Sequence, residues 1–337
     1  MTGKQVRSAV FVVAVLSSLS PAALAHHSVG VTFDTSRPVE LAGEITEVSW
    51  RNPHMRFTMR TVVDGVETLM EVEAIPATRL ARVGLSPEIL SIGAEVSAFG
   101  YPSRRDADEM YALNLLLADG REVLLDTPTP HWTNNTIGTG TDLTPGNRGS
   151  DSSLGLFRVW STDARGYSDQ IERFLTEQAR AERERWDPFS ADNPFPGCTA
   201  KGMPTIMGQP NPMEIVDRGD EILIRIEEYD TVRVISMREP PVPPGPPTLL
   251  GHAYGRWEGD TLVVTTTGID WRNFSQDGLM QSEAMEVVER FRVNDDGSRL
   301  EYEQTLTDPW LFTEPVKRTK SWVWVPGDEV RPYECTA

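Results

Sequence analysis

Apolar and polar residues alternate along several short stretches in the first third of the chain, and this alternation predicts β-strands. The predicted strands are Val39–Trp50, His54–Val63, Glu67–Glu73, Ala94–Phe99 and Met110–Leu117. The phase of the first stretch slips near Gly43, which indicates a bulge or a bend in that strand. Between the third and the fourth strand, Ala77–Val83 is predicted to be a short helix.

Strands with one helix after the third follow the element order of an OB-fold, which is a small Greek-key barrel. We therefore expect residues 26–125 to form an OB-like β domain. The order alone does not indicate a ligand, because one fold serves many functions.

A linker with one helix is expected over residues 126–191. Its first part, residues 126–160, is rich in Thr, Gly, Pro, Asn and Ser, as linkers are. The helix is expected over Ser168–Trp186, because Ser168 can cap it and apolar residues recur near helical spacing between Ile171 and Ala179.

Short strands separated by turns occupy residues 192–337, which we expect to be an antiparallel β domain, either a closed barrel or a curved sheet. The predicted strands are Glu221–Glu228, Thr231–Met237, Gly251–Trp257, Thr261–Thr267, Ser282–Val293, Leu300–Thr307 and Val316–Val325. Pro240–Pro247 is expected to form a rim or a lid, because a central strand does not tolerate so many prolines. Gly255-Arg256-Trp257 resembles the Gly-x-Trp of lipocalins, which implies a calycin-like barrel as one form of this domain.

The first 25 residues have the pattern of a secretory signal peptide. Lys4 and Arg7 precede an uncharged apolar run, and Ala23-Leu24-Ala25 has the small-x-small pattern of a cleavage site. Cleavage after Ala25 predicts a periplasmic or secreted protein. No later apolar run reaches the length of a membrane-spanning helix, so no stable membrane insertion is expected after cleavage.

The formal net charge of −18 bears on the expected partners. Nucleic acids and anionic membranes bind basic patches, so we expect neither as a partner. An acidic protein attracts cations, and the expected ligand is a metal ion or a small molecule. The sequence does not identify a protein partner.

Cys198 and Cys335 are the two cysteines of the chain. In an oxidising compartment an even number of cysteines predicts a disulfide. A Cys198–Cys335 bridge would attach the last residues of the chain to the start of the second domain. Two free buried thiols are the alternative.

Signal cleavage would make His26 the first residue of the mature protein, with His27 beside it. An N-terminal histidine offers a metal its imidazole and its α-amino group, whose pKa of about 7.7–8.0 is low for an amine. This pair suits copper, and it resembles the histidine brace of lytic polysaccharide monooxygenases and of some periplasmic copper carriers. His54, which follows Asn52-Pro53, could supply one more imidazole. We therefore take His26, His27 and His54 as candidate metal ligands; a frayed terminus and a turn-capping His54 are the alternatives.

Two glutamates share an otherwise apolar face of the predicted strand Ser282–Val293. If this face points into the barrel, Glu283 and Glu289 are candidates for acid–base catalysis, and His252 and Asp270 could join them at the barrel mouth. The alternative is a structural ion pair between Glu289 and an arginine such as Arg225 or Arg233. The motifs of serine hydrolases, nucleotide hydrolases and zinc peptidases are absent from the sequence.

The chain resembles a family of exported bacterial proteins of unknown function in three features. These are His26-His27-Ser28, the strand with Gly43, and Asn52-Pro53-His54. This resemblance implies export and a two-part architecture, and it implies no activity. We therefore expect an exported binding protein with a copper site of the histidine-brace type. Two alternatives stay open: an enzyme acting on a small apolar molecule in the C-terminal barrel, and a structural envelope protein with an exposed apolar patch.

Overall fold

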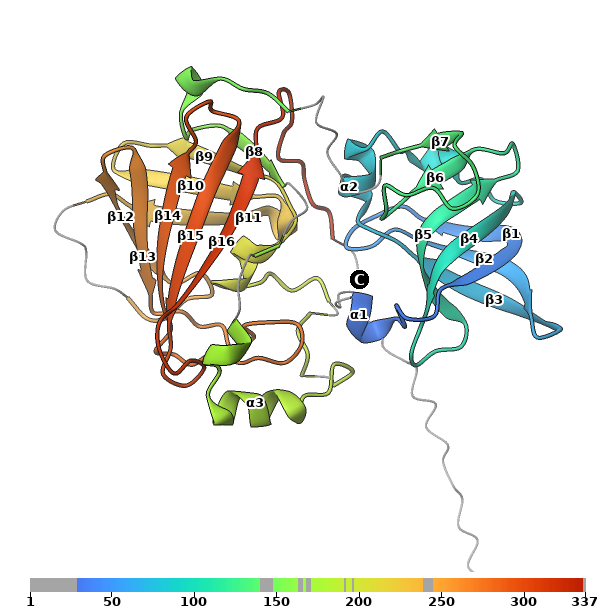
Figure 1. The fold of residues 1–337 in the computed structure, drawn as a ribbon, viewed down its shortest axis with the longest axis horizontal. Helices are drawn as coiled ribbons and strands as arrows, with labels where there is room; N and C mark the ends of the chain where they lie inside the picture. The colour runs from blue at the N-terminus through green and yellow to red at the C-terminus, as the bar shows by residue number, and fades with distance from the viewer. Residues whose placement is uncertain are drawn as a thin grey trace, which may run out of the picture.

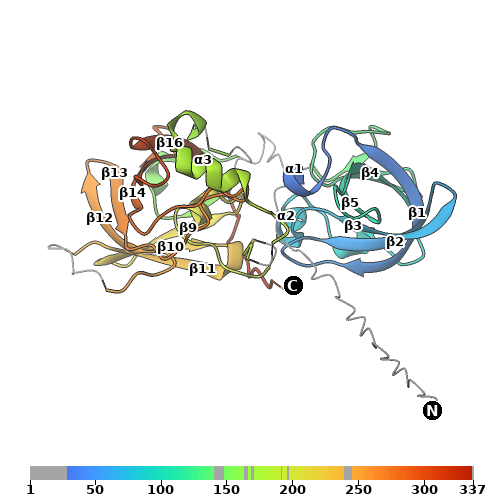
Figure 2. The same cartoon turned by 90° about the horizontal axis from the view of Figure 1, so that it is seen from below.

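The computed structural model describes residues 29–139, 148–162, 166–167, 171–190, 192–195, 197–238 and 245–335. Within these ranges the chain forms two β-barrels that lie side by side (Figure 1, Figure 2). The predicted fold class, mostly β with a small N-terminal barrel and a larger C-terminal barrel, is confirmed. Among the described residues, no helix is both long enough and apolar enough to cross a bilayer.

The N-terminal barrel has the element order expected for an OB-like domain. Its elements are α1 (Val29–Thr32), β1 (Val39–Ser49), β2 (Arg56–Val63), β3 (Val66–Glu73), α2 (Ala77–Arg82), β4 (Glu95–Pro102) and β5 (Glu109–Leu117). The strands follow the order β3-β2-β1-β4-β5, and a parallel pairing of β3 with β5 closes the ring.

Gly43 lies where β1 passes very close to β2. A Cβ atom at this position would stand 2.3 Å from the carbonyl oxygen of Arg60, so only glycine fits. The register between β1 and β2 shifts between Ile45 and Glu47. The predicted irregularity of this strand is therefore present, although the shift lies a few residues after Gly43.

The N-terminal sheet extends beyond residue 125, where the sequence predicted the linker to begin. β6 (Glu122–Leu124) pairs with β5, and β7 (Thr136–Ile137) pairs with β6. The buried Glu122 carboxylate accepts hydrogen bonds from the backbone N–H groups of residues 131–133, which fixes the loop between the two strands. The first part of the predicted linker therefore belongs to this sheet.

The C-terminal barrel is closed, as one of the two predicted forms required. Its strands are β8 (Val159–Thr162), β9 (Met213–Asp217), β10 (Glu221–Ile226), β11 (Thr231–Ser236), β12 (His252–Glu258), β13 (Thr261–Thr267), β14 (Glu286–Val293), β15 (Arg299–Thr307) and β16 (Val316–Val323). They form a ring in the order β10-β11-β12-β13-β14-β15-β16-β8-β9, in which β11 and β12 run parallel. The predicted linker contributes β8, and β9 was not predicted. This ring differs from the eight-stranded up-and-down barrel of lipocalins.

The helix expected over Ser168–Trp186 is shorter in the structure. α3 covers Glu177–Glu184, and the side chain of Thr176 caps its first turn. Leu175 forms an isolated β-bridge with Phe312, which takes the backbone before α3 out of a helical path. The predicted cap, Ser168, lies outside the described residues. Short 3-10 turns lie at Pro87–Ile89, Ser152–Leu154, Ile171–Phe174, Thr205–Gly208 and Glu228–Asp230.

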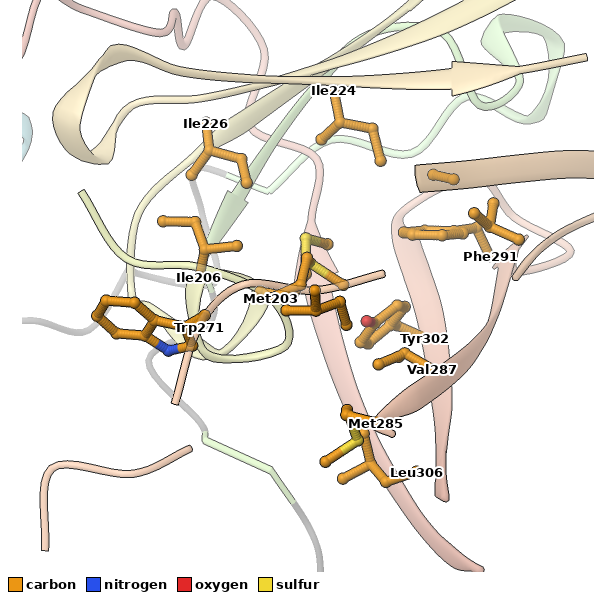
Figure 3. Packing of buried hydrophobic residues seen from close by; sticks show 14 of the residues in the cluster. Met203, Ile206, Ile224, Ile226, Trp271, Met285, Val287, Phe291, Tyr302 and Leu306 are labelled. Carbon is orange, nitrogen blue, oxygen red and sulfur yellow. The ribbon is translucent and has the colours of Figure 1, made fainter. Parts of the chain in front are cut away.

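Each barrel encloses its own apolar core. In the C-terminal barrel, Met203 and Ile206 come from the segment before β9 and lie among side chains of β10, β14 and β15 (Figure 3). Each fully buried side chain of this kind contributes about 1.5–3 kcal/mol to stability. Side chains therefore fill the centre of this barrel.

The C-terminal tail, residues 324–335, runs from β16 into the space between the two barrels (Figure 1). Arg82, at the end of α2, donates hydrogen bonds to both carboxylate oxygens of Glu227, which is completely buried. The same guanidinium donates to Asp328 at 3.1 Å and to the carbonyl oxygen of Glu329 at 2.7 Å, both in the tail. One arginine of the N-terminal barrel therefore contacts both the tail and the other barrel.

The predicted disulfide between Cys198 and Cys335 is present. It connects the end of the tail to the segment that leads into β9. The disulfide therefore closes the part of the chain that contains most of the C-terminal barrel.

Candidate metal centre

His54 lies two residues before β2, and its side chain is only 11% exposed. Its Nδ1 atom stands 3.0 Å from the carbonyl oxygen of Ala74 and 3.1 Å from Oε1 of Glu73. A carbonyl oxygen only accepts hydrogen bonds, so a neutral ring would carry its proton on Nδ1 and its lone pair on Nε2. Histidines that bind a metal almost always donate their other N–H to a carboxylate or a backbone carbonyl. His54 is held in the same way.

Glu73 ends β3 and is completely buried. Arg56 donates to it through Nη2 at 2.7 Å, and Nη1 of Arg56 lies 3.1 Å from Oε1 of Glu71. Burial lowers the pKa of Arg56, but the charges of Glu73 and Glu71 outweigh burial and the pKa is raised. Arg56 therefore places a positive charge beside the buried Glu73 side chain.

A second titratable group, Glu109, begins β5 and pairs with Glu71 across the parallel β3–β5 contact. Burial, followed by the negative charges of Glu73 and Glu71, raises the pKa of Glu109 to about 7. Arg56 acts in the opposite direction. Glu109 therefore exchanges a proton near neutral pH, close to the pair of His54 and Glu73.

The first described residues of the chain lie on the side of the barrel that carries His54. The ring of Phe33, which follows α1, lies 5.5 Å from the ring of Tyr111. The Tyr111 hydroxyl donates to Asp126 at 2.7 Å. Burial raises the pKa of Asp126, and the charges of Arg79 and His54 oppose this rise. Both views show α1 and α2 on the side of the N-terminal barrel that faces the other barrel (Figure 1, Figure 2).

Of the three predicted copper ligands, only His54 lies among the described residues. His26 and His27 lie outside them, just before Val29, the first described residue. Within the described part of the chain, no three His, Cys, Asp or Glu side chains are arranged to hold a metal ion.

Glu289 points into the C-terminal barrel and is completely buried. Nη1 of Arg233 donates to it at 2.9 Å, and the Tyr302 hydroxyl donates at 2.6 Å. Gln304 donates to the Tyr302 oxygen at 2.8 Å and accepts from Arg318 at 2.7 Å. This network contains the structural ion pair with Arg233 that the sequence left open as an alternative.

The structure does not bring the other acid–base candidates together with Glu289. Glu283 is exposed and lies before β14, because Ser282 is held in a turn by two hydrogen bonds to the Asp308 carboxylate. The prediction that Glu283 and Glu289 share a strand face is therefore wrong. Asp270 is exposed after β13, and His252 at the start of β12 lies 2.9 Å from the carbonyl oxygen of Pro246.

Clefts open on the described surface of the C-terminal barrel. His252 lines a cleft of about 520 Å³ where β11 and β12 pair over two residues only. A second cleft, of about 580 Å³, is lined by charged side chains of β14 and β15. Glu283, Glu289 and Asp270 are not among the described residues that line these clefts.

Exposed apolar side chains gather on the β2–β3 hairpin of the N-terminal barrel. Val62 is 63% exposed, Val66 is 64% exposed and Leu69 is 58% exposed. A structural envelope protein would require an exposed apolar patch. On the described surface, these three residues resemble such a patch most.

Sequence reasoning missed the residues around His54, namely Glu73, Arg56, Glu109, Tyr111 and Asp126. One signal was present, since alternation places Glu71 and Glu73 on the same face of their strand as they approach its end. The parallel contact of β3 with β5, which brings Glu109 and Tyr111 to this face, has no local signal in the sequence.

Residues 13–110 match the model of a family described as a family of unknown function, DUF6152. The matched part includes both N-terminal histidines, His54 and Glu73. The resemblance to an uncharacterised family, expected from the histidine motifs, is confirmed for this part of the chain. No curated protein matches the chain.

Proposed function

We propose that this chain is an exported metal-binding protein in which His26 and His54 share one copper ion. The observation that carries the proposal is the fixed Nδ1 atom of His54, which lies near the carbonyl oxygen of Ala74 and the Glu73 carboxylate. A histidine held through Nδ1 has a fixed ring orientation, and Nε2 is then the nitrogen that would bind a metal.

The missing donors would come from the mature N-terminus. Cleavage after Ala25 would give His26 an α-amino group and an imidazole, which with Nε2 of His54 make three nitrogen donors. Borderline divalent metals such as copper prefer nitrogen donors of this kind. His27 is the alternative source of an imidazole. The contact of Phe33 with Tyr111 supports this arrangement, because it directs the start of the chain to the His54 side of the barrel.

Charge near the site also favours a cation. The chain carries a net charge of −18, and Glu73, Glu109 and Asp126 all lie near His54. Arg56 balances only part of this negative charge. Binding a divalent ion would lower the repulsion among these carboxylates.

The proposal is tested by titrating the processed protein with Cu(II) against a competing chelator. Mass spectrometry first establishes that the protein begins at His26. We expect one Cu(II) per chain, and we expect His54→Ala to weaken binding at least about tenfold, since even residues that only orient a ligand contribute that much. A protein with one alanine added before His26 should be weakened as well.

His131 provides the matched control, because its side chain is 32% exposed, forms an ion pair with Glu40 and stacks on Phe99. His131→Ala should bind copper as the unchanged protein does. Equal affinity of His54→Ala and the unchanged protein would rule out the proposed site.

A further inference from the structure

Asn52 lies between α2 and the C-terminal tail and is only 4% exposed. Its side-chain amide donates to the carbonyl oxygen of Tyr333. Its side-chain oxygen accepts from the backbone N–H of Thr78 at 3.3 Å and from the Thr78 hydroxyl at 3.2 Å. The backbone of Asn52 also forms a β-bridge with Cys335. The loop that leads to His54 is therefore attached directly to the end of the tail.

The disulfide holds this end of the tail in place. Tyr333 is buried against Tyr229, with their rings 5.0 Å apart, and its N–H donates to Asp230 at 3.2 Å. Cys335, two residues later, is bonded to Cys198. Cys198 is exposed and Cys335 is partly exposed, so a reductant in solution can reach the bond.

From these contacts we infer that the Cys198–Cys335 disulfide regulates the metal affinity of His54, and that its reduction weakens metal binding. This inference rests on the proposed function, because it concerns the same site. Asn52 is the residue that transmits the effect, since it contacts Tyr333 and Cys335 and lies two residues before His54.

The reductant would be a dithiol. One of its thiolates attacks a sulfur of the disulfide and forms a mixed disulfide, and its second thiol then displaces the protein sulfur. Two electrons and two protons pass to the protein. The products are two cysteine thiols on this chain and one disulfide on the reductant.

Reduction acts on the site through geometry. Without the covalent bond, the residues after Tyr333 lose their anchor on the C-terminal barrel, and the bridge between Asn52 and Cys335 loses its support. Metal ligands must be held within about 0.5 Å of their productive positions, so small shifts in the Asn52–His54 loop reduce affinity. Couplings between two sites typically change affinity by about 5–150-fold, and we expect about tenfold here.

The test compares the Cu(II) affinities of four proteins. Each protein either has its disulfide intact or lacks both cysteines, because free thiols would bind copper themselves. These are the unchanged protein, Cys198→Ser/Cys335→Ser, Asn52→Ala, and the triple variant. We expect the double serine variant and Asn52→Ala each to bind about tenfold more weakly. Because both act through one contact, the triple variant should be no weaker than either of them.

Ser161→Ala is the matched control, because Ser161 contacts the tail at Asp328, far along the chain from Asn52. It should bind copper as the unchanged protein does. If the serine variant does not fold, the folded wild-type protein is reduced with a dithiol, its thiols are capped with a methanethiosulfonate, and its affinity is measured instead.

The outcomes separate this inference from the proposed function. An unchanged protein that binds no copper removes the proposed function and this inference with it. An unchanged protein that binds copper, with equal affinity in the thiol-free or capped protein, overturns the inference alone. A triple variant weakened by the product of the two separate effects would also overturn it, because Asn52 would not be the link.

Discussion

At the scale of single residues, the orientation of His54 is the feature on which the account depends. An imidazole has two nitrogens, and the partner of one decides which chemistry the other can perform. Here Nδ1 faces the carbonyl oxygen of Ala74 and the buried Glu73 carboxylate. Glu73 is in turn held by Arg56. His54 is therefore positioned by groups that would not touch the metal.

Glu73→Gln tests this positioning role. The substitution keeps the shape of the side chain and removes the charge that stabilises the proton on Nδ1, so Cu(II) affinity should fall about 10–100-fold. Glu71→Gln is the control, because Glu71 contacts Arg56 and its side chain is 46% exposed. Both variants are titrated with Cu(II) against a competing chelator. If their Cu(II) affinities are equal, Glu73 does not position His54.

The raised pKa of Glu109 predicts how the stability of the folded protein changes with pH. Below its ordinary pKa of 4.5, the folded and the unfolded protein both carry the proton; between 4.5 and about 7, only the folded protein keeps it. The stability that Glu109 contributes is therefore fully present below pH 4.5 and is lost as the pH rises through about 7. After allowing for its partial exposure, this loss is about 1–2 kcal/mol.

Urea unfolding of the unchanged protein and of Glu109→Gln, at pH 4.5 and pH 8, measures this loss. The stability of the unchanged protein should fall by about 1–2 kcal/mol relative to the variant over this range. Parallel pH profiles of the two proteins would contradict a raised pKa at Glu109.

The sequence led to part of this site and not to the rest. His54 could be proposed because a histidine after Asn-Pro at the start of a strand is a local pattern. The disulfide could be proposed because two cysteines allow only one pair. Glu73 and Glu109 become neighbours of His54 only through the β3–β5 contact, and a contact between distant segments has no local pattern.

At the scale of elements, the C-terminal barrel has a polar network in an apolar interior. Glu289 on β14, Arg233 on β11 and Tyr302 on β15 meet inside the ring, and all three are buried. Glu289, which the sequence suggested for acid–base chemistry, thus has the charged Arg233 within hydrogen-bond distance. Its arrangement is that of an ion pair that fixes the packing of three strands.

Glu289→Ala should destabilise the protein by about 3–5 kcal/mol, because it leaves the buried Arg233 without a counter-charge. Arg233→Met combined with Glu289→Leu removes both charges and should cost less than the single substitution. Free energies of unfolding in urea decide the matter. A double variant that is less stable than Glu289→Ala would mean that the pair itself stabilises the barrel.

Element prediction succeeded where the strands are long and failed where they are short. β14 and β15 show clear alternation over eight and nine residues. β8 has four residues and pairs with each neighbour over two residues only, so no period can be recognised. β9 follows a stretch with Pro210 and Pro212, which concealed it. The ends of α3 depend on Leu175 pairing with Phe312, a tertiary contact.

At the scale of the whole molecule, the tail and Arg82 connect the two barrels. The alternation of apolar and polar residues predicted two β domains, and both are present. The predicted linker of residues 126–191 is only partly a linker, because β7 and β8 within it complete the two sheets. Linker composition and strand content overlap here, since short barrel strands contain the same small and polar residues as loops.

Arg82→Ala should destabilise the contact between the barrels by about 3 kcal/mol or more, because the completely buried Glu227 carboxylate would lose its guanidinium. Arg60→Ala is the control, since the Arg60–Glu44 pair is exposed and contributes about 0–1 kcal/mol. Differential scanning calorimetry should show a lower first transition for Arg82→Ala alone. Equal transition temperatures of the two variants would mean that the barrels do not depend on this contact.

The most direct test of the central claim is a crystal structure of the processed protein with Cu(II), using anomalous scattering at the copper absorption edge. We predict one strong anomalous peak about 2 Å from Nε2 of His54 and from the α-amino nitrogen of His26, as is usual for metal–imidazole bonds. A fully loaded protein whose copper peak lies away from His54, or that shows no ordered copper at all, would contradict the account.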